Sequence, residues 1–125
     1  MREIIATDSG PKAIGPYSQA VKANGFVFIS GQIALDPATQ QLVSGGMAEQ
    51  TDRVMRNVEA ILAAAGSSLE KVVRCGVFLK NMSDFPVMNE VYGKFFRKSP
   101  PARTTVEAAR LPKDSLVEID VIALE

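Results

Sequence analysis

In the segment Leu116–Leu124, near the end of the chain, apolar residues occupy most positions on both faces of a possible strand. One alternation is wholly apolar, and the other mixes apolar residues with Glu118 and Asp120. A strand with one wet face would alternate apolar with polar residues, so this pattern predicts a strand covered on both sides. The segments 26–29 and 72–80 are also largely apolar on both faces. The chain is therefore restricted to folds in which neither face of the sheet is freely wetted.

Each of these strands has a predicted pair of faces. In the last strand, the wholly apolar face consists of Val117, Ile119, Val121 and Ala123. In the middle strand, the residues expected on one face are Val73, Cys75, Val77 and Leu79, and those expected on the other are Val72 and Phe78.

Two amphipathic helices are predicted beside the strands. Apolar residues recur at helical spacing within 48–65, and Gly66 suits the C-terminal cap. A second helix is expected from about Ser83, with Pro86 tolerated in its first turn. The expected strands are residues 17–22, 25–30, 72–80, 104–108 and 116–124, with a short extra strand near Ile4.

This order of elements predicts an α+β fold, in which two helices cover one face of a mixed sheet. Asn24-Gly25 predicts a tight hairpin between the first two main strands. At 125 residues the chain is expected to form a single domain, 1–125. Because two helices cover only one face, the other face is expected to meet another subunit. The alternative is a curved sheet whose second face is merely mixed.

The composition excludes several kinds of chemistry. There is no histidine and one cysteine, Cys75, so Ser–His pairs, His-ligated metals and thiolate zinc clusters are ruled out. No phosphate-binding glycine motif is present. We therefore expect no metal, and we expect any catalysis to use the remaining polar side chains, backbone groups and water. Lys plus Arg equals Asp plus Glu, at 14 each, which argues against binding to nucleic acid or a membrane. Without a signal-peptide pattern or an apolar run long enough to span a bilayer, the chain is expected to be cytoplasmic.

Two charged residues stand out in the C-terminal segments. Arg103 follows Pro100-Pro101-Ala102 and opens a β-branched strand, and Glu118 lies among apolar neighbours on the last strand. A fixed cation and a half-buried carboxylate suit a small substrate that carries a carboxylate. The alternatives are a surface arginine or a structural ion pair between Arg103 and Glu118, and for Glu118 an exposed strand glutamate.

Six short segments, in this order and spacing, resemble the Rid (reactive intermediate deaminase, YjgF-like) family over almost the whole chain. They are Ile14–Ala20, Phe28–Gln32, Met88–Tyr92, Pro101–Arg103, Leu111–Lys113 and Val117–Ile119. The resemblance implies a chorismate-mutase-like α+β fold and a homotrimer with clefts between subunits. It also implies hydrolysis of 2-imino acids and their enamine tautomers to 2-keto acids and ammonia, without a cofactor.

The resemblance also assigns roles to individual residues. Arg103 matches the arginine that holds the substrate carboxylate, and Glu118 matches the cleft glutamate, which would orient water and relay protons. Tyr17 matches the cleft tyrosine, expected from across the subunit boundary; the alternative is a tyrosine that packs the hairpin. Ser30 would shape the cleft, or bond only to nearby backbone. Asn89 would position a loop or ligand, or serve helix capping or solvation.

The sequence departs from common relatives just after the arginine. Many relatives have cysteine where Thr105 stands and Ser or Ala where Thr104 stands, so a thiol role is excluded at this position. Only the backbone N–H of Thr105 remains as a donor to the substrate carboxylate. Cys75 does not replace the missing thiol, because it lies on a predicted core face and is expected to serve packing.

The main prediction is therefore an enzyme, a hydrolase that acts on C=N bonds of the 2-iminobutanoate/2-iminopropanoate type. The alternative is a non-catalytic protein of the same fold, which binds keto acids and acts through a partner. Ribonuclease or translation-inhibiting activity, credited to some relatives, is disfavoured by the zero net charge and the absence of histidine.

Overall fold

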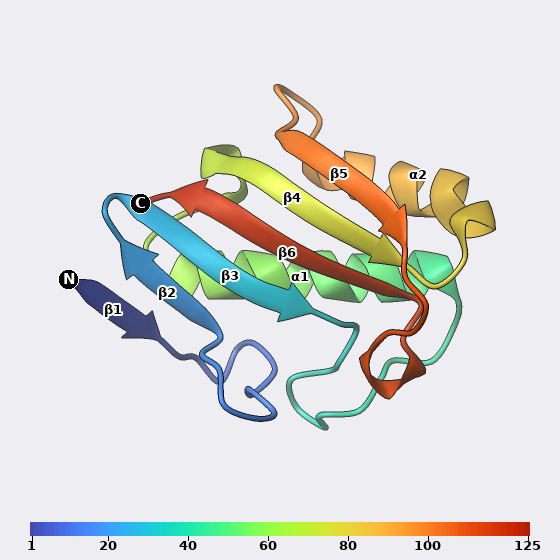
Figure 1. The fold of residues 1–125 in the computed structure, drawn as a ribbon, viewed down its shortest axis with the longest axis horizontal. Helices are drawn as coiled ribbons and strands as arrows, with labels where there is room; N and C mark the ends of the chain where they lie inside the picture. Colours follow the sequence, from blue (N-terminus) through green and yellow to red (C-terminus); the bar gives the residue numbers. More distant parts are fainter.

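The strand β6 lies at the centre of the computed structural model, which describes all residues from 1 to 125 (Figure 1). The strands are β1 (Arg2–Ile5), β2 (Ala20–Ala23), β3 (Phe26–Gln32), β4 (Val72–Leu79), β5 (Ala102–Glu107) and β6 (Val117–Leu124). The helices are α1 (Met47–Ala64) and α2 (Phe85–Phe95), with 3-10 turns at Leu69–Lys71, Met82–Asp84 and Pro112–Asp114. The predicted order of elements is confirmed, including the short first strand.

One six-stranded sheet has the order β1-β2-β3-β6-β4-β5. Only β4 and β5 pair in parallel, so the sheet is mixed as predicted. The hairpin between β2 and β3 turns at Asn24 and Gly25, whose φ angles are 53° and 84°. Positive φ at both central residues is what a tight hairpin turn requires, and this explains why the chain has Asn-Gly there.

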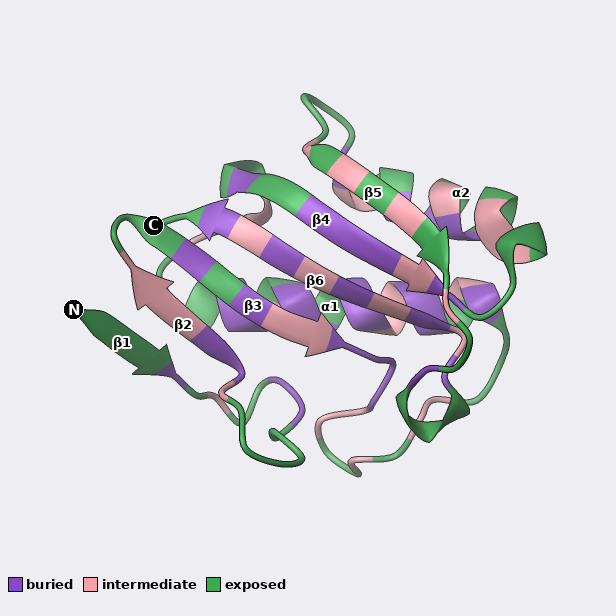
Figure 2. Ribbon diagram, in the orientation of Figure 1, coloured by how far each residue is buried: buried purple, intermediate pink, exposed green.

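Both helices cover the same face of the sheet (Figure 1). The apolar alternation of β6 faces them and is almost wholly buried, and Figure 2 shows the resulting stripes along the strand. The helix α1 ends where expected, with Gly66 at a φ of 78° just after its cap. No helix combines the length and the hydropathy that crossing a bilayer requires.

The opposite face of the sheet is open and carries large apolar side chains. Phe28 lies opposite Ile122 in the register of β3 and β6, and Phe26 lies opposite Leu124. Phe28 is 43% exposed and Leu124 is 45% exposed. Ile4 at one edge and Val106 at the other are exposed as well. The prediction that two helices leave one apolar face uncovered is confirmed for the single chain.

The predicted faces of β4 are wrong at its first residues. Val72, rather than Val73, is buried with Cys75, Val77 and Leu79, and Val73 is 39% exposed. The pairing with β6 jumps from Val72 to Arg74, which marks a bulge with one extra residue. A period of two read from the sequence cannot detect such an extra residue, because both candidates are valine.

Candidate functional site

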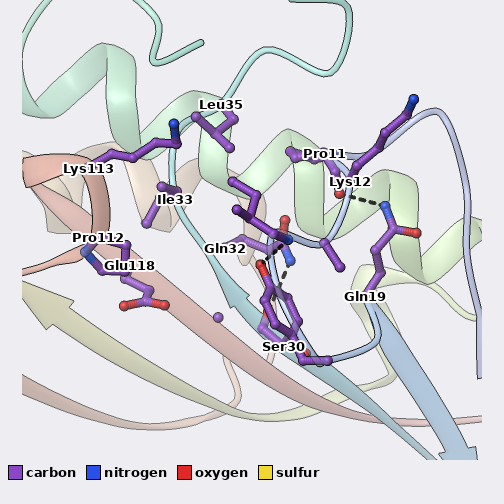
Figure 3. Close-up of a pocket in the computed structure, with 14 residues that line it drawn as sticks. Pro11, Lys12, Gln19, Ser30, Gln32, Ile33, Leu35, Pro112, Lys113 and Glu118 are labelled. Atoms are coloured by element: carbon purple, nitrogen blue, oxygen red, sulfur yellow. Dashed lines mark hydrogen bonds between the residues drawn. The ribbon is translucent and has the colours of Figure 1, made fainter. Parts of the chain in front are cut away.

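A cavity of about 440 Å³ opens beside the adjoining ends of β3 and β6 (Figure 3). One wall is the loop before β2, and the other is the 3-10 turn before β6. The polar side chains around it come from Lys12, Tyr17, Gln19, Ser30, Gln32, Lys113 and Glu118, and apolar ones include Ile14, Ile33 and Leu35. We call this the glutamate cavity. Three of the predicted site residues, Tyr17, Ser30 and Glu118, therefore share one site.

Glu118 projects from β6 toward the open face and reaches this cavity as a half-buried carboxylate. Burial raises the pKa of the Glu118 carboxyl, and the nearby Asp120 carboxylate acts in the same direction. No cation pairs with Glu118, and Figure 3 shows the Lys113 ammonium turned away from it. A carboxyl with a raised pKa keeps its proton more readily than an ordinary carboxyl, which favours a role in proton transfer.

Gly31 makes this position of Glu118 possible. A Cβ at residue 31 would overlap Oε2 of Glu118 and lie 2.9 Å from its Cδ. Any side chain there would push the carboxylate away from the cavity. The glycine was part of a motif recognised in the sequence, but only the structure shows what its missing side chain permits.

Gln19 holds the loop wall of the cavity, a role that sequence reasoning missed. Its side-chain amide donates to the carbonyls of Pro11 at 2.6 Å, Thr7 at 3.0 Å and Gly10 at 3.3 Å. Its Oε1 accepts from the N–H of Thr7 at 2.6 Å. The side chain is buried and bonds only to backbone, so the shape of residues 7–11 depends on one glutamine. The available signal was a polar residue directly before the buried Ala20, the first residue of β2.

Tyr17 and Ser30 line the cavity with their hydroxyl groups already engaged. The hydroxyl oxygen of Tyr17 accepts a bond from the N–H of Ile14 at 3.0 Å, and the residue is 48% exposed. Tyr17 lies in a loop rather than in the expected strand from residue 17. Ser30 donates its hydroxyl proton to the carbonyl of Ser18 at 2.6 Å. Ser30 therefore forms the bond to nearby backbone that was the predicted alternative, and it also lines the cavity.

Two buried amides of α1 fix the segments behind the cavity. Asn57 donates to the carbonyl of Leu35 at 2.9 Å, and Gln50 accepts from the N–H of Leu116 at 2.9 Å. Each bond satisfies a backbone group that has no partner in the sheet. The helix therefore sets the positions of both chain segments that flank Glu118.

Arg103 belongs to a second cluster, away from the glutamate cavity. It lies on the edge strand β5, paired in register with the buried Cys75, so its side chain is on the helix-covered side of the sheet. Its guanidinium carbon lies 4.9 Å from the ring centre of Tyr92 and 5.5 Å from that of Phe85. We call this group the arginine cluster.

No carboxylate pairs with Arg103. The ion pairs of the chain are Lys22–Glu125, Arg56–Asp52, Arg74–Asp120 and Arg110–Asp114. The structural ion pair between Arg103 and Glu118, one of the alternatives from the sequence, is therefore not formed within one chain. The N–H donors of this guanidinium remain free for an anion.

Thr105 and Asn89 adjoin Arg103. Ala108 donates its N–H to Leu79 in β4 at 2.8 Å. Since successive N–H groups of a strand point to opposite edges, the N–H of Thr105 points away from β4 and is unpaired at the sheet edge. Asn89 lies on the same face of α2 as Phe85 and Tyr92, and its Oδ1 is buried without a hydrogen-bond partner. Two of the predicted substrate-binding residues, Thr105 and Asn89, thus lie beside the arginine, whereas Ser30 and Tyr17 line the glutamate cavity.

The two clusters cannot meet within one chain. Glu118 of β6 pairs in register with Phe78 of β4, and Phe78 pairs in turn with Val106 of β5. Arg103 precedes Val106 by three residues on β5. Strand spacing and rise place Arg103 and Glu118 roughly 14 Å apart along the sheet, and their side chains leave opposite faces. One molecule the size of a keto acid cannot bridge them.

Cys75 serves packing, as expected. The residue is fully buried in the core, and burial raises the pKa of its thiol. A buried thiol with a raised pKa is a poor nucleophile. No group of three or more His, Cys, Asp or Glu side chains is placed to hold a metal ion.

Comparisons with known proteins show the family and the fold that this chain shares. The model of the family described as Endoribonuclease L-PSP matches residues 7–125. A RutC family protein of Pyrococcus horikoshii is 54% identical over 123 residues, which cover 98% of each chain. The mouse 2-iminobutanoate/2-iminopropanoate deaminase is 45% identical over 125 residues, covering 100% of this chain and 93% of the mouse protein. The crystal structure of RidA from an Antarctic Psychrobacter superposes with a TM-score of 0.95 at 45% identity, covering 98% and 99% of the two chains.

Proposed function

This chain belongs to the Endoribonuclease L-PSP family, to which the Rid (YjgF-like) proteins belong, and on that premise we propose that it is a 2-imino-acid deaminase. Its substrates are reactive enamines and imines of the 2-iminobutanoate and 2-iminopropanoate type. Its products are the 2-keto acid and ammonia, and the reaction needs no cofactor. The observation that carries the proposal is Glu118, an unpaired and half-buried carboxyl with a raised pKa that reaches a cavity.

The working unit is a homotrimer of single-domain chains with its sites between subunits. The uncovered apolar face, with Phe26, Phe28 and Leu124, supports assembly through the sheet. The separation of the arginine cluster from the glutamate cavity supports sites built from two copies. The number three comes from the resemblance to the family alone.

In this site, Arg103 of one copy holds the substrate carboxylate near the glutamate cavity of another. A guanidinium offers two parallel donors to a carboxylate, and the unpaired N–H of Thr105 adds a third. Asn89 and Ser30 contact the rest of the molecule, and Tyr17 forms part of the cavity wall. The substrate carbon that reacts then lies within reach of Glu118.

Glu118 moves the protons of the hydrolysis. The carboxylate accepts a proton from water as the water oxygen bonds to the iminium carbon, which gives a tetrahedral amino alcohol. Glu118 then returns that proton to the nitrogen. The C–N bond breaks as the C=O bond forms, Glu118 accepts the hydroxyl proton, and ammonia leaves and takes up that proton as ammonium, which restores the Glu118 carboxylate. The imine already reacts with water unaided, so positioning of water and substrate accounts for the acceleration.

The test generates imines in situ from several amino acids with an amino-acid oxidase and follows imine loss with and without the protein. The wild type should accelerate the loss, and Glu118→Gln should reduce the acceleration by about 10²-fold. Because Arg103 is intact in this variant, it should still bind 2-oxobutanoate in calorimetry. Binding of the keto acid by the wild type without any acceleration would favour the alternative, a non-catalytic keto-acid-binding protein.

A further inference from the structure

The geometry points to Phe85 and Tyr92 as positioning residues, which hold the Arg103 guanidinium in the orientation that binds the substrate carboxylate. This inference rests on the proposed function, because it assigns the arginine a carboxylate to bind. Phe85 and Tyr92 touch the arginine rather than the reacting atoms. They act through Arg103 alone.

The contacts that carry the inference are two cation–π pairs on one guanidinium. The carbon Cζ of Arg103 lies 4.9 Å from the Tyr92 ring and 5.5 Å from the Phe85 ring, both within the 6 Å range of such contacts. The two rings stand two turns apart on one face of α2. The helix therefore presents a pair of aromatic surfaces to an arginine on the neighbouring strand.

Aromatic rings hold a guanidinium in a way that carboxylates cannot. In the pair of Arg110 with Asp114, two carboxylate oxygens occupy the arginine Nε and one terminal nitrogen, at 2.8 and 3.2 Å. An aromatic ring attracts the flat face of the guanidinium, so the N–H donors at the edge of the guanidinium stay free. Arg103 is thus immobilised without losing the groups that a substrate carboxylate needs.

The ring of Tyr92, and not its hydroxyl, is the part that acts on Arg103. The hydroxyl oxygen is buried without a hydrogen-bond partner, and Arg103 lies over the ring. A phenylalanine at this position would keep the aromatic surface. A leucine would keep an apolar, though smaller, side chain and remove the aromatic surface.

The same helix offers a matched control. Arg56 of α1 lies 5.9 Å from the ring of Phe95, a third cation–π pair, but Arg56 already binds Asp52 and lies outside both clusters. Phe95→Leu therefore removes an aromatic–arginine contact from α2 without touching Arg103. Any general effect of losing a ring from the helix should appear in this variant too.

The test measures calorimetric affinity for 2-oxobutanoate on the assembled protein, beside thermal midpoints. Phe85→Leu and Tyr92→Leu should each weaken binding about tenfold, with Tyr92→Phe and Phe95→Leu within about twofold of the wild type. In NMR spectra, the Arg103 Nε–H should show a ring-current shift in the wild type and in Tyr92→Phe, and lose much of it in the leucine variants. A general structural role would lower the thermal midpoint while leaving the affinity of the folded fraction intact.

Each outcome bears on the inference. Wild-type affinity in a folded Phe85→Leu protein, or an Arg103→Ala protein that binds 2-oxobutanoate normally, would overturn it. Absence of 2-oxobutanoate binding by the wild type would overturn it as well. Should Tyr92→Leu not fold, Phe85→Leu at a half-buried position and the wild-type NMR shift still decide the question. If the wild type binds the keto acid without hydrolysing imines, the proposed enzyme function fails while this inference is still judged by binding.

Discussion

At the scale of single residues, the shape of the Arg103 side chain matters as much as its charge. Arg103→Lys should therefore fail nearly as badly as Arg103→Ala. Lysine keeps the charge but loses the planar fork that binds a carboxylate with two bonds. Loss of a charged hydrogen bond in a partly dry site should cost about 2–5 kcal/mol of binding or transition-state energy. Imine-hydrolysis kinetics of both variants check this, and a lysine variant with most of the wild-type rate would remove the carboxylate-binding role.

Gly31 provides a test of Glu118 that leaves Glu118 itself unchanged. Gly31→Ala should displace the carboxylate and reduce imine hydrolysis by about 10²-fold, since small displacements of a reacting group have effects of that size. Gly76→Ala is the matched control, because a Cβ there would collide with Asp120 on the same sheet face. We expect the control to keep most of its rate. Equal losses in the two variants would mean that the backbone, and not Glu118, is responsible.

The raised pKa of Glu118 predicts how stability depends on pH. The folded protein holds this proton more tightly than the unfolded chain does, so stability falls as pH rises from the ordinary carboxyl range through the raised pKa. Glu118→Gln removes the effect. Its thermal midpoint should match the wild type near pH 4 and exceed it near pH 7. A variant that is less stable than the wild type at pH 7 would show that the ionised carboxylate is stabilised by its surroundings.

At the scale of elements, the cavity depends on loops that side-chain amides hold in place. Gln19→Leu should leave the N–H and carbonyl of Thr7 and the carbonyl of Pro11 without partners. Unpaired buried groups of this kind cost about 1–3 kcal/mol each, so the thermal midpoint should fall and hydrogen exchange in residues 7–14 should quicken. Gln41→Leu, at an exposed side chain, is the control. Unchanged hydrogen exchange in Gln19→Leu would mean that residues 7–14 keep their conformation without the Gln19 side chain.

The helices and strands were largely predictable from local patterns, whereas their irregularities were not. Helical spacing and Gly66 located α1, and Asn24-Gly25 located the first hairpin, because each signal lies in neighbouring residues. The bulge after Val72 depends instead on how β4 pairs with β6. The anchoring of residues 7–11 by Gln19 depends on contacts eight to twelve residues away along the chain.

For the site residues, too, identity could be predicted from the sequence, whereas spatial arrangement could not. Arg103, Glu118, Tyr17, Ser30 and Asn89 were named from motifs, and their roles stay predictions. Motifs carry no information on which sheet face each residue occupies relative to the others, so the separation of the arginine from the glutamate emerged only from the register of β4, β5 and β6.

At the scale of the whole molecule, sites built from two copies predict complementation. Arg103→Ala and Glu118→Ala proteins should each be inactive alone. When they are unfolded together and reassembled, about a quarter of the sites should combine an intact Arg103 from one copy with an intact Glu118 from another, if exchange is random. Imine hydrolysis should therefore return to about that fraction of the wild-type rate. A reassembled mixture without activity would place the whole site in one chain.

The open apolar face also changes which mutations a gene for this protein can tolerate. A polar substitution at Phe28 or Leu124 touches neither Arg103 nor Glu118. In the proposed assembly it nevertheless separates them, because each chain carries only half of a site. Such a substitution would then abolish activity as the loss of a catalytic residue does, although every catalytic side chain is still encoded. Sequence variation on this face should accordingly be as restricted as variation in the cavity.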